Sequence, residues 1–256
     1  MPEGPEVKRI GENLARLISG KTLENIDILS GRYIKKPPSG WIEIQQQLPT
    51  KVIGPGVHGK FLYWLCSDET FIFNTLGLSG FWSSSKDKHS RVKFSFRDGT
   101  CVYFSDQRSF GTIKFVRGKH QMIEKLTSLG PDMLTSDISD QDFITLFRKK
   151  PTWSITKLLM DQSIIAGVGN YIKADSLYLS QISPHRTITD ISDGELAVLN
   201  RSIKQIMHES YAKTAGDDYP DKFLIYGKTT DVDGNKVIKE ETADKRTTYW
   251  VPKVQK

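Results

Sequence analysis

The sequence predicts an α+β protein with an N-terminal helix, a β-rich segment, a helical domain and a C-terminal β-hairpin. Three observations support this prediction: apolar residues at helical spacing near the start, aromatic and β-branched runs up to about residue 117, and helical periods from about residue 124. With 256 residues, the chain exceeds the usual size of a single domain. We expect three segments, 1–123, 124–222 and 223–256.

The first helix is predicted over Val7–Leu17, where apolar residues recur every three or four positions. Pro5 suits the first turn of this helix, because its backbone angle is already helical and its missing N–H would have no partner there. Gly20 follows the last apolar residue of the pattern and supplies the stop signal.

The segment Leu23–Arg117 is expected to be β structure, because short aromatic and β-branched runs are divided by Gly, Pro, Ser and Asp. The clearest hairpin is RVKFSFRDGTCVYFSD, in which Asp98–Gly99 turns the chain between two alternating runs. Cys66 and Cys101, the two cysteines of the chain, lie in such runs. We expect buried thiols rather than a disulfide framework or a cysteine-based zinc site.

Helical periods replace the strand pattern over 124–211 and predict a separate helical domain. Within it, AGVGN at residues 166–170 separates two helices with a glycine-rich turn. Such a turn presents backbone N–H groups and the Asn170 side chain at a helix start, where they can bind a phosphate. An ordinary helix-helix turn capped by the asparagine is the alternative interpretation.

The chain returns to β character after Phe223. Val237 and Ile238 belong to one expected strand and Thr247–Val251 to the next, with the polar residues 242–245 between them. Arg246 is therefore expected at the tip of a hairpin.

The charge balance favours a polyanionic partner, because 36 basic and 30 acidic residues give a net charge of +6. The N-terminus lacks the long apolar run of a signal peptide, and no later run approaches membrane-spanning length. We expect a soluble intracellular protein without a membrane partner.

The start of the chain, Met1-Pro2-Glu3, offers an unusual nucleophile. A small second residue permits removal of the initiator methionine, which would leave Pro2 with a free secondary amine. Such an amine is far less basic than a lysine, and after condensing at a sugar C1′ it forms an iminium with no N–H to lose. Glu3 could protonate the sugar ring oxygen. The alternative is a capped helix start whose carboxylates have no chemical role.

Six sequence blocks extend over nearly the whole chain. They are MPEGPEV at 1–7, HGKF at 58–61, LGLSG at 76–80, DQRSFG at 106–111, LLMDQSIIAGVGNYIKADSL at 158–177 and RTTYWVPKVQK at 246–256. In sequence and order they resemble the formamidopyrimidine-DNA glycosylase/endonuclease VIII (Fpg/Nei) family of bifunctional base-excision glycosylases. The resemblance implies a two-layered β-sandwich for the β-rich segment, followed by a helix-two-turn-helix domain and a hairpin finger, with DNA bound in the cleft between the two main domains.

The resemblance assigns the catalytic residues by position. Pro2 matches the Schiff-base nucleophile, Glu3 the catalytic acid, and Glu6 a second acidic position near the reacting sugar. Lys60 matches a lysine that binds a phosphate beside the lesion, and we count it with the catalytic set. Asn170 and Arg246 match two further phosphate-binding residues, one from the helical domain and one from the finger.

Three further residues match positions that fill the void left by a flipped nucleotide, namely Leu78, Arg108 and Phe110. Filling this void matters because flipping a base costs a few kcal/mol of stacking. An aromatic wedge recovers about 1–3 kcal/mol of it, and an arginine can hydrogen-bond the widowed base. Leu78 stands where methionine is commoner in the family. Without the resemblance, Phe110 would be taken for a core residue.

The finger departs from most bacterial members of the family, which carry four zinc-binding cysteines there. No cysteine follows Cys101; Val251 and Val254 stand at the spacing of the second pair, and Asp233 or Thr230 near the first. Valine cannot bind zinc. We therefore expect a zincless finger, no metal site and no cofactor.

The predicted function is that of a bifunctional DNA glycosylase and AP lyase in base excision repair, monomeric and acting on double-stranded DNA with oxidised bases or abasic sites. A noncatalytic binder of damaged DNA, a monofunctional glycosylase and a metal-dependent nuclease are the alternatives. The nuclease would need clustered acids such as Asp217, Asp218 and Asp221, which a solvated loop explains equally well.

The segment 213–222, between the last helix and the finger, bears on the choice of lesion. It is short, whereas relatives that recognise 8-oxoguanine often have a longer, glycine-rich loop. We therefore expect a preference for oxidised pyrimidines, formamidopyrimidines and hydantoins, with an 8-oxoguanine-directed enzyme as the alternative.

Overall fold

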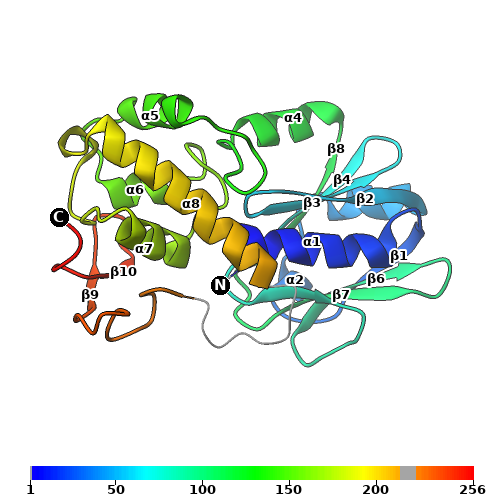
Figure 1. Cartoon of the computed structure of the whole chain (residues 1–256). Helices are drawn as coiled ribbons and strands as arrows, with labels where there is room; N and C mark the ends of the chain where they lie inside the picture. The colour runs from blue at the N-terminus through cyan, green and yellow to red at the C-terminus, as the bar shows by residue number, and fades with distance from the viewer. Residues whose placement is uncertain (1, 214–222) are drawn as a thin grey trace. The chain divides into compact units, whose positions relative to one another are not determined.

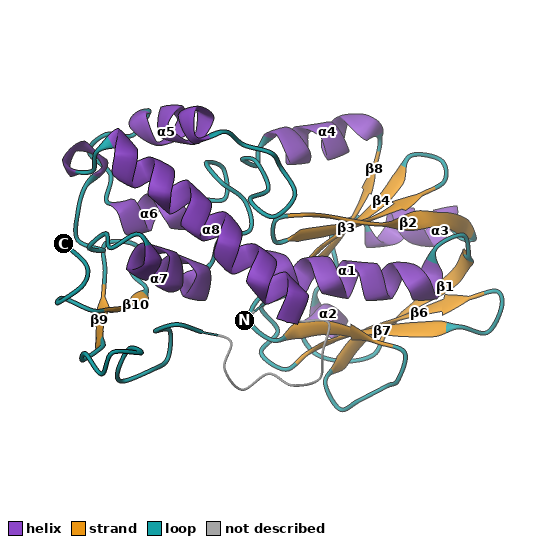
Figure 2. Ribbon diagram, in the orientation of Figure 1, coloured by secondary structure: helices purple, strands orange, loops and turns teal. Residues whose placement is uncertain are grey.

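The computed structural model describes residues 2–213 and 223–256 and groups them into two compact units. The first unit holds Pro2 and Glu6–Ser128, and the second holds Glu3–Pro5 and Leu129–Lys256. Each unit has its own apolar core. Figure 1 follows the chain from blue to red through both units, and Figure 2 marks their helices and strands.

The first unit combines helix α1 with an antiparallel sheet of eight strands. Helix α1 spans Gly4–Ile18, which confirms the predicted first helix. The strand order is β5-β7-β6-β1-β2-β3-β4-β8. The strands are β1 (Thr22–Ile28), β2 (Thr50–His58), β3 (Phe61–Cys66), β4 (Thr70–Thr75), β5 (Gly80–Ser83), β6 (Ser90–Phe96), β7 (Cys101–Asp106) and β8 (Thr112–Arg117).

The sheet folds into two four-stranded layers, because β1 and β2 pair only at Thr22 and Leu23. Figure 2 draws the layers above and below α1 in that view. Side chains of both layers meet in one core: Trp64 of β3 and Phe94 of β6 have ring centroids 4.9 Å apart. Burying such an aromatic side chain stabilises the fold by roughly 1.5–3 kcal/mol. The predicted β-sandwich and the 98–99 hairpin between β6 and β7 are confirmed.

Two short helices interrupt the segment that was expected to be entirely β structure. Helix α2 spans Arg32–Lys35 and helix α3 spans Trp41–Gln47. Helix α3 buries Ile44, and its Trp41 ring lies 5.9 Å from that of Phe115. A helix of two turns has too few residues to show its period in the sequence, so this part of the prediction is wrong.

Both cysteines are free thiols, as expected. Cys66 is buried, and burial raises its pKa to about 12. Cys101 is only half-buried, because it begins β7 beside the exposed 98–99 turn.

The second unit is helical, with a small hairpin at its end. Helix α4 (Lys119–Thr127) closes the first unit. The helices of the second unit are α5 (Asp140–Arg148), α6 (Ile155–Met160), α7 (Asn170–Leu179), the 3-10 helix η1 (Ile188–Asp190) and α8 (Asp193–Lys213). The hairpin consists of β9 (Ile238–Glu241) and β10 (Thr247–Trp250), as the sequence predicts.

The hairpin stands on a small apolar cluster. Ile225, Val237 and Val251 are its buried members, and Val254 packs against them. Val251 and Val254, which the family resemblance places at the spacing of a cysteine pair, therefore make apolar contacts. The segment before the hairpin is anchored by Asp175 of α7, whose buried carboxylate accepts hydrogen bonds from three consecutive N–H groups, at residues 224–226.

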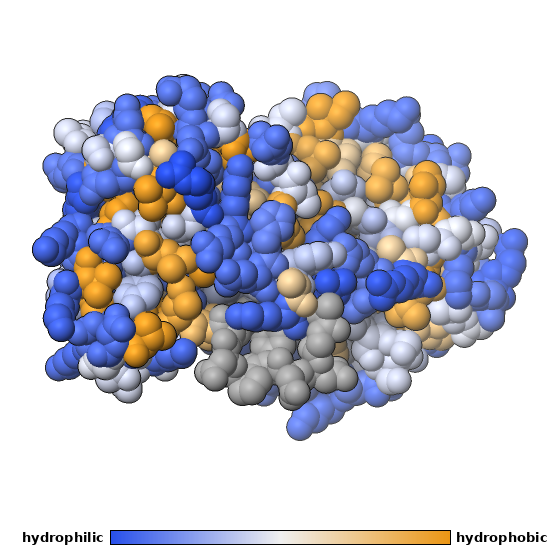
Figure 3. Space-filling view, in the orientation of Figure 1, coloured by the Kyte–Doolittle hydropathy of each residue, from blue (hydrophilic) through white to orange (hydrophobic). Residues whose placement is uncertain are grey.

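Among the described residues, no helix combines the length and apolar character that crossing a bilayer requires. Figure 3 shows hydrophilic side chains over much of the surface in view, with apolar side chains in small groups.

Candidate active site

Glu3 lies at the start of helix α7, although 167 positions separate it from Asn170, the first residue of that helix. Its side chain is 1% exposed. The carboxylate accepts hydrogen bonds from the backbone N–H of Tyr171 at 2.9 Å and of Ile172 at 3.4 Å. The N–H of Gly4 donates to the carbonyl of Gly167 at 2.9 Å. The positive end of the helix dipole adds to these contacts, which together hold Glu3 in one position.

The glycines of AGVGN make room for this carboxylate. A Cβ atom on Gly169 would lie 2.2 Å from Cδ of Glu3 and 2.5 Å from each of its carboxylate oxygens. Gly167 adopts a φ of 98°, which a residue with a side chain rarely adopts. The N–H groups of Tyr171 and Ile172, just after this turn, donate to Glu3 and are not offered to a phosphate. A phosphate contact made by the turn at residues 166–170 itself stays a prediction.

Asn170 and the finger hairpin meet beside this carboxylate site. The N-cap of α7 is Gly169, so Asn170 is the first helical residue and not the cap. Its side-chain amide donates to the carbonyl of Thr247 at 2.7 Å. Its Oδ1 is buried and has no hydrogen-bond partner among the described residues. Arg246, which precedes Thr247, is exposed at the hairpin turn, as the sequence predicts.

A buried ion pair that sequence analysis missed also joins α7 to this turn. Lys173 Nζ lies 2.5 Å from Asp244 Oδ2, and the two side chains are 0% and 3% exposed. Burial lowers the pKa of Lys173, while Asp244 and Glu3 act in the opposite direction. A lysine flanked by Ile172 and Ala174 on a largely buried helix was the available sign of such a pair.

The remaining catalytic candidates lie on the first unit. Pro2 is half-buried and, being bonded to Glu3, has its Cα about 3.8 Å from that of Glu3. Glu6 is half-buried in the first turn of α1. Lys60 lies in the tight turn between β2 and β3, after Gly59 with a φ of 57°, and not within a strand.

The three void-filling candidates lie on two loops of the first unit that pack together. Leu78 is half-buried in the turn between β4 and β5, while Arg108 and Phe110 lie between β7 and β8. Phe110 is 56% exposed, and the Arg108 guanidinium stacks 5.3 Å from its ring centre. A Cβ on Gly77 would lie 2.7 Å from the Gly111 nitrogen, so the loops touch backbone to backbone.

Asp106 ties these two loops together. This residue is 1% exposed, and its Oδ1 accepts from the Ser79 hydroxyl at 2.6 Å and from the Arg108 N–H at 3.2 Å. Its Oδ2 accepts from the Gly111 N–H at 2.7 Å. Asp106 begins the block DQRSFG, and the sequence alone assigned it no role. Its position at the end of a predicted strand, before a polar loop, is the feature of the sequence that could have indicated this role.

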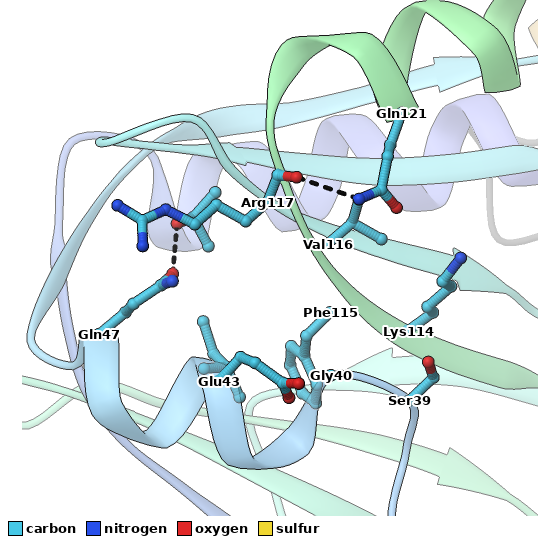
Figure 4. A pocket seen from close by; sticks show the side chains of 11 residues that line it. Ser39, Gly40, Glu43, Gln47, Lys114, Phe115, Val116, Arg117 and Gln121 are labelled. Atoms are coloured by element: carbon cyan, nitrogen blue, oxygen red, sulfur yellow. Dashed lines mark hydrogen bonds between the residues drawn. The ribbon is translucent and has the colours of Figure 1, made fainter.

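A pocket of about 340 Å³ in the first unit contains none of these candidates (Figure 4). It lies among α3, β8 and the start of α4, and its charged lining combines Glu43 with Lys114 and Arg117. Two hydrogen bonds lie within its lining: the Thr70 hydroxyl donates to the Gln47 side chain, and the Gln121 side chain donates to the Arg117 carbonyl. Its charged lining therefore carries both signs.

Several sequence predictions fall on residues outside the described part of the chain. These residues are Met1 and the segment 214–222, which carries Asp217, Asp218 and Asp221. Within residues 2–213 and 223–256, no group of three or more His, Cys, Asp or Glu side chains gathers in a way that could hold a metal ion.

Comparison with known families matches nearly the whole chain. The formamidopyrimidine-DNA glycosylase N-terminal domain matches residues 1–113, its H2TH domain matches 129–218 and its C-terminal domain matches 216–256. Formamidopyrimidine-DNA glycosylase of Halalkalibacterium halodurans is 32% identical over 82% of this chain and 78% of its own length. The Listeria monocytogenes protein of that name is 30% identical over the whole of both chains.

Solved structures share the fold. A Lactococcus lactis formamidopyrimidine-DNA glycosylase bound to DNA with an AP site superposes with a TM-score of 0.87 at 23% identity, covering 99% of both chains. A MutM protein in complex with DNA containing carbocyclic 8-oxoguanine gives 0.88 at 23% identity over the whole of both chains. These matches confirm the α+β architecture with its H2TH domain and terminal hairpin. The chain belongs to the formamidopyrimidine-DNA glycosylase family, a family of DNA glycosylases.

Proposed function

We propose that this protein is a bifunctional DNA glycosylase and AP lyase of base excision repair that uses the Pro2 amine as its nucleophile. The observation that carries the proposal is the fixed position of Glu3, the residue bonded to Pro2. A buried carboxylate held at a helix start, next to the secondary amine that removal of Met1 would free, would form an acid-base and nucleophile pair. A noncatalytic DNA binder would have no use for it.

In the proposed reaction the Pro2 nitrogen forms a bond to C1′ of the damaged nucleotide and loses its proton, while the base departs with the electrons of the glycosidic bond and takes up a proton. Glu3 donates a proton to the sugar ring oxygen as the ring opens, which leaves an iminium between C1′ and Pro2. The iminium acidifies the C2′ proton. Its removal expels the 3′ phosphate, a second elimination expels the 5′ phosphate, and water then releases Pro2.

DNA binding is proposed to depend on Lys60, Asn170 and Arg246, which would contact phosphates beside the lesion. The hydrogen bond from Asn170 to Thr247, next to Arg246, supports a joint role for these two residues. Leu78, Arg108 and Phe110 would enter the stack after the nucleotide has flipped, with Glu6 near the reacting sugar. The exposed ring of Phe110 beside the Arg108 guanidinium supports this part of the proposal.

Oxidised pyrimidines, formamidopyrimidines and hydantoins are the proposed lesions, on the basis of the short segment 213–222. The test is a panel of duplexes that each carry one lesion: 5-hydroxyuracil, a formamidopyrimidine, a hydantoin or 8-oxoguanine. We expect strand cleavage to be slowest at 8-oxoguanine. If cleavage is fastest at 8-oxoguanine, the enzyme is directed at 8-oxoguanine and the proposed lesion preference is wrong. Binding to the panel without any cleavage would favour the noncatalytic binder.

Chelation should leave activity intact, because the finger hairpin rests on the apolar cluster of Ile225, Val237 and Val251 and not on metal ligands. We expect equal rates of lesion cleavage before and after incubation with EDTA and removal of the chelator. The control is the same protein incubated in buffer alone. A large loss that zinc restores would mean that the finger needs a metal after all.

Replacing Asp106 with asparagine should slow excision from duplex DNA, because an amide group cannot accept from both Gly111 and the Ser79–Arg108 pair. Loss of one hydrogen bond to a charged group costs about 1.5–3 kcal/mol, equivalent to roughly ten- to a hundredfold in rate. A lesion in single-stranded DNA leaves no void to fill, so its excision rate should hardly change. Asp98→Asn, at the exposed end of the same hairpin, is the matched control. Equal losses on both substrates would contradict the assigned role.

A further inference from the structure

The buried ion pair between Lys173 and Asp244 is unusual in its setting. Asp244 belongs to the finger turn, and its second oxygen accepts from the Thr242 hydroxyl at 2.6 Å. The N–H of Thr242 in turn donates to the carbonyl of Arg246 at 3.1 Å, which closes the turn. Lys173 lies one helical turn after Asn170 on α7. The pair therefore joins the helix that carries one proposed phosphate contact to the turn that carries the other.

Stability alone is a poor explanation for this pair. Removing two charges from water costs about as much as their attraction returns, and apolar replacements of such pairs are often at least as stable. What an ion pair adds is a defined geometry. Together with the hydrogen bond from Asn170 to Thr247, it attaches the turn to α7 on both sides of Arg246. The backbone of Arg246 is held between these two attachments.

We propose that Lys173 and Asp244 are positioning residues, which hold Arg246 in register with Asn170 so that both reach the DNA backbone together. This inference rests on the proposed function, in which Arg246 binds a phosphate. In a finger without metal-binding cysteines, the pair supplies a fixed link between helix α7 and the hairpin, beside the hydrogen bond from Asn170 to Thr247.

The charges around the pair predict what its loss would do. Lys173 feels the charges of Asp244, Glu3 and Arg246, and the last of these is repulsive. Without the Asp244 carboxylate, Lys173 would be a buried cation that repels the Arg246 side chain. Without the Lys173 ammonium, Asp244 would be a buried anion able to draw Arg246 toward itself. Either change should withdraw Arg246 from the phosphate.

The salt dependence of DNA binding measures this effect. A plot of log K against log salt concentration has a negative slope, and each phosphate contact increases the magnitude of that slope by about 0.9. The probe is a duplex with a tetrahydrofuran abasic analogue, which binds without reacting. Arg246→Ala should reduce the magnitude of the slope by the share of one phosphate contact, about 0.9. Asp244→Asn should reduce it by the same amount. The Asp244→Asn/Arg246→Ala double variant should match Arg246→Ala alone, since both changes remove the same contact. Asp233→Asn, at an exposed acid of the same segment, should leave the slope unchanged.

The outcomes separate the two proposals. If Arg246→Ala leaves the slope unchanged, the phosphate role of Arg246 is wrong. If Arg246→Ala lowers the slope but Asp244→Asn does not, or if Asp244→Asn lowers it further in the double variant, the positioning role is wrong. Should Asp244→Asn fail to fold, the apolar pair Lys173→Met/Asp244→Leu removes both charges and is judged by the same slopes. Lys173→Arg, which keeps the cation, should retain the wild-type slope.

Discussion

Blocking the Pro2 nitrogen should abolish covalent trapping on damaged DNA. An extension of two residues before Pro2 turns its nitrogen into a tertiary amide, whose lone pair is delocalised and cannot attack C1′. Removing a nucleophile of this kind lowers the rate by on the order of 10⁴-fold or more. The measurement is borohydride trapping on a duplex with one lesion, together with strand cleavage.

Binding to the tetrahydrofuran duplex should survive this extension, because the proposed phosphate contacts lie elsewhere on the chain. The same two residues added after Lys256 are the control for tagging. Pro2→Ala is a second variant: it keeps an amine but yields a primary one, and it should be trapped far less than the native protein. Normal trapping by Pro2→Ala, or an active protein whose mass still includes Met1, would exclude the assigned nucleophile.

Replacing Gly169 with alanine should remove most of the glycosylase activity, although Gly169 is not itself proposed to take part in the reaction or to bind DNA. The new Cβ would fall 2.2 Å from Cδ of Glu3, a distance that no packing tolerates. Gly169 has extended backbone angles, φ −129° and ψ −157°, that alanine can adopt. The clash must therefore be relieved by moving Glu3. Loss of a general acid lowers rates by roughly 10²–10⁴-fold, and we expect a decrease within that range.

A shortened carboxylate tests whether the effect acts through Glu3. Glu3→Asp in the Gly169→Ala background should recover part of the lost rate, because a shorter side chain leaves space for the new methyl group. Gly194→Ala, in helix α8 where an added Cβ meets only Ser192 Oγ at 4.0 Å, is the matched control and should be neutral. Wild-type excision rates in Gly169→Ala would show that the placement of Glu3 against α7 does not matter to the reaction.

Local patterns were sufficient for most of the fold. Alternating Val92, Phe94 and Phe96 and the Asp98–Gly99 turn predicted β6 and β7, and helical spacing after Pro5 predicted α1. Each depends on residues close in sequence, whose periodicity the chain itself displays. Helices α2 and α3 escaped prediction because they are too short to show a period.

The sequence by itself determined the family, the order of the elements and the identity of the proposed chemical groups, from Pro2 and Glu3 to Arg246. Only the tertiary structure decided that Glu3 caps helix α7, that Gly169 makes room for it, and that Lys173 pairs with Asp244. These contacts join residues about 70 to 170 positions apart. Nothing in a local pattern encodes such contacts, because a polar side chain reveals its partner only after packing has excluded water from both.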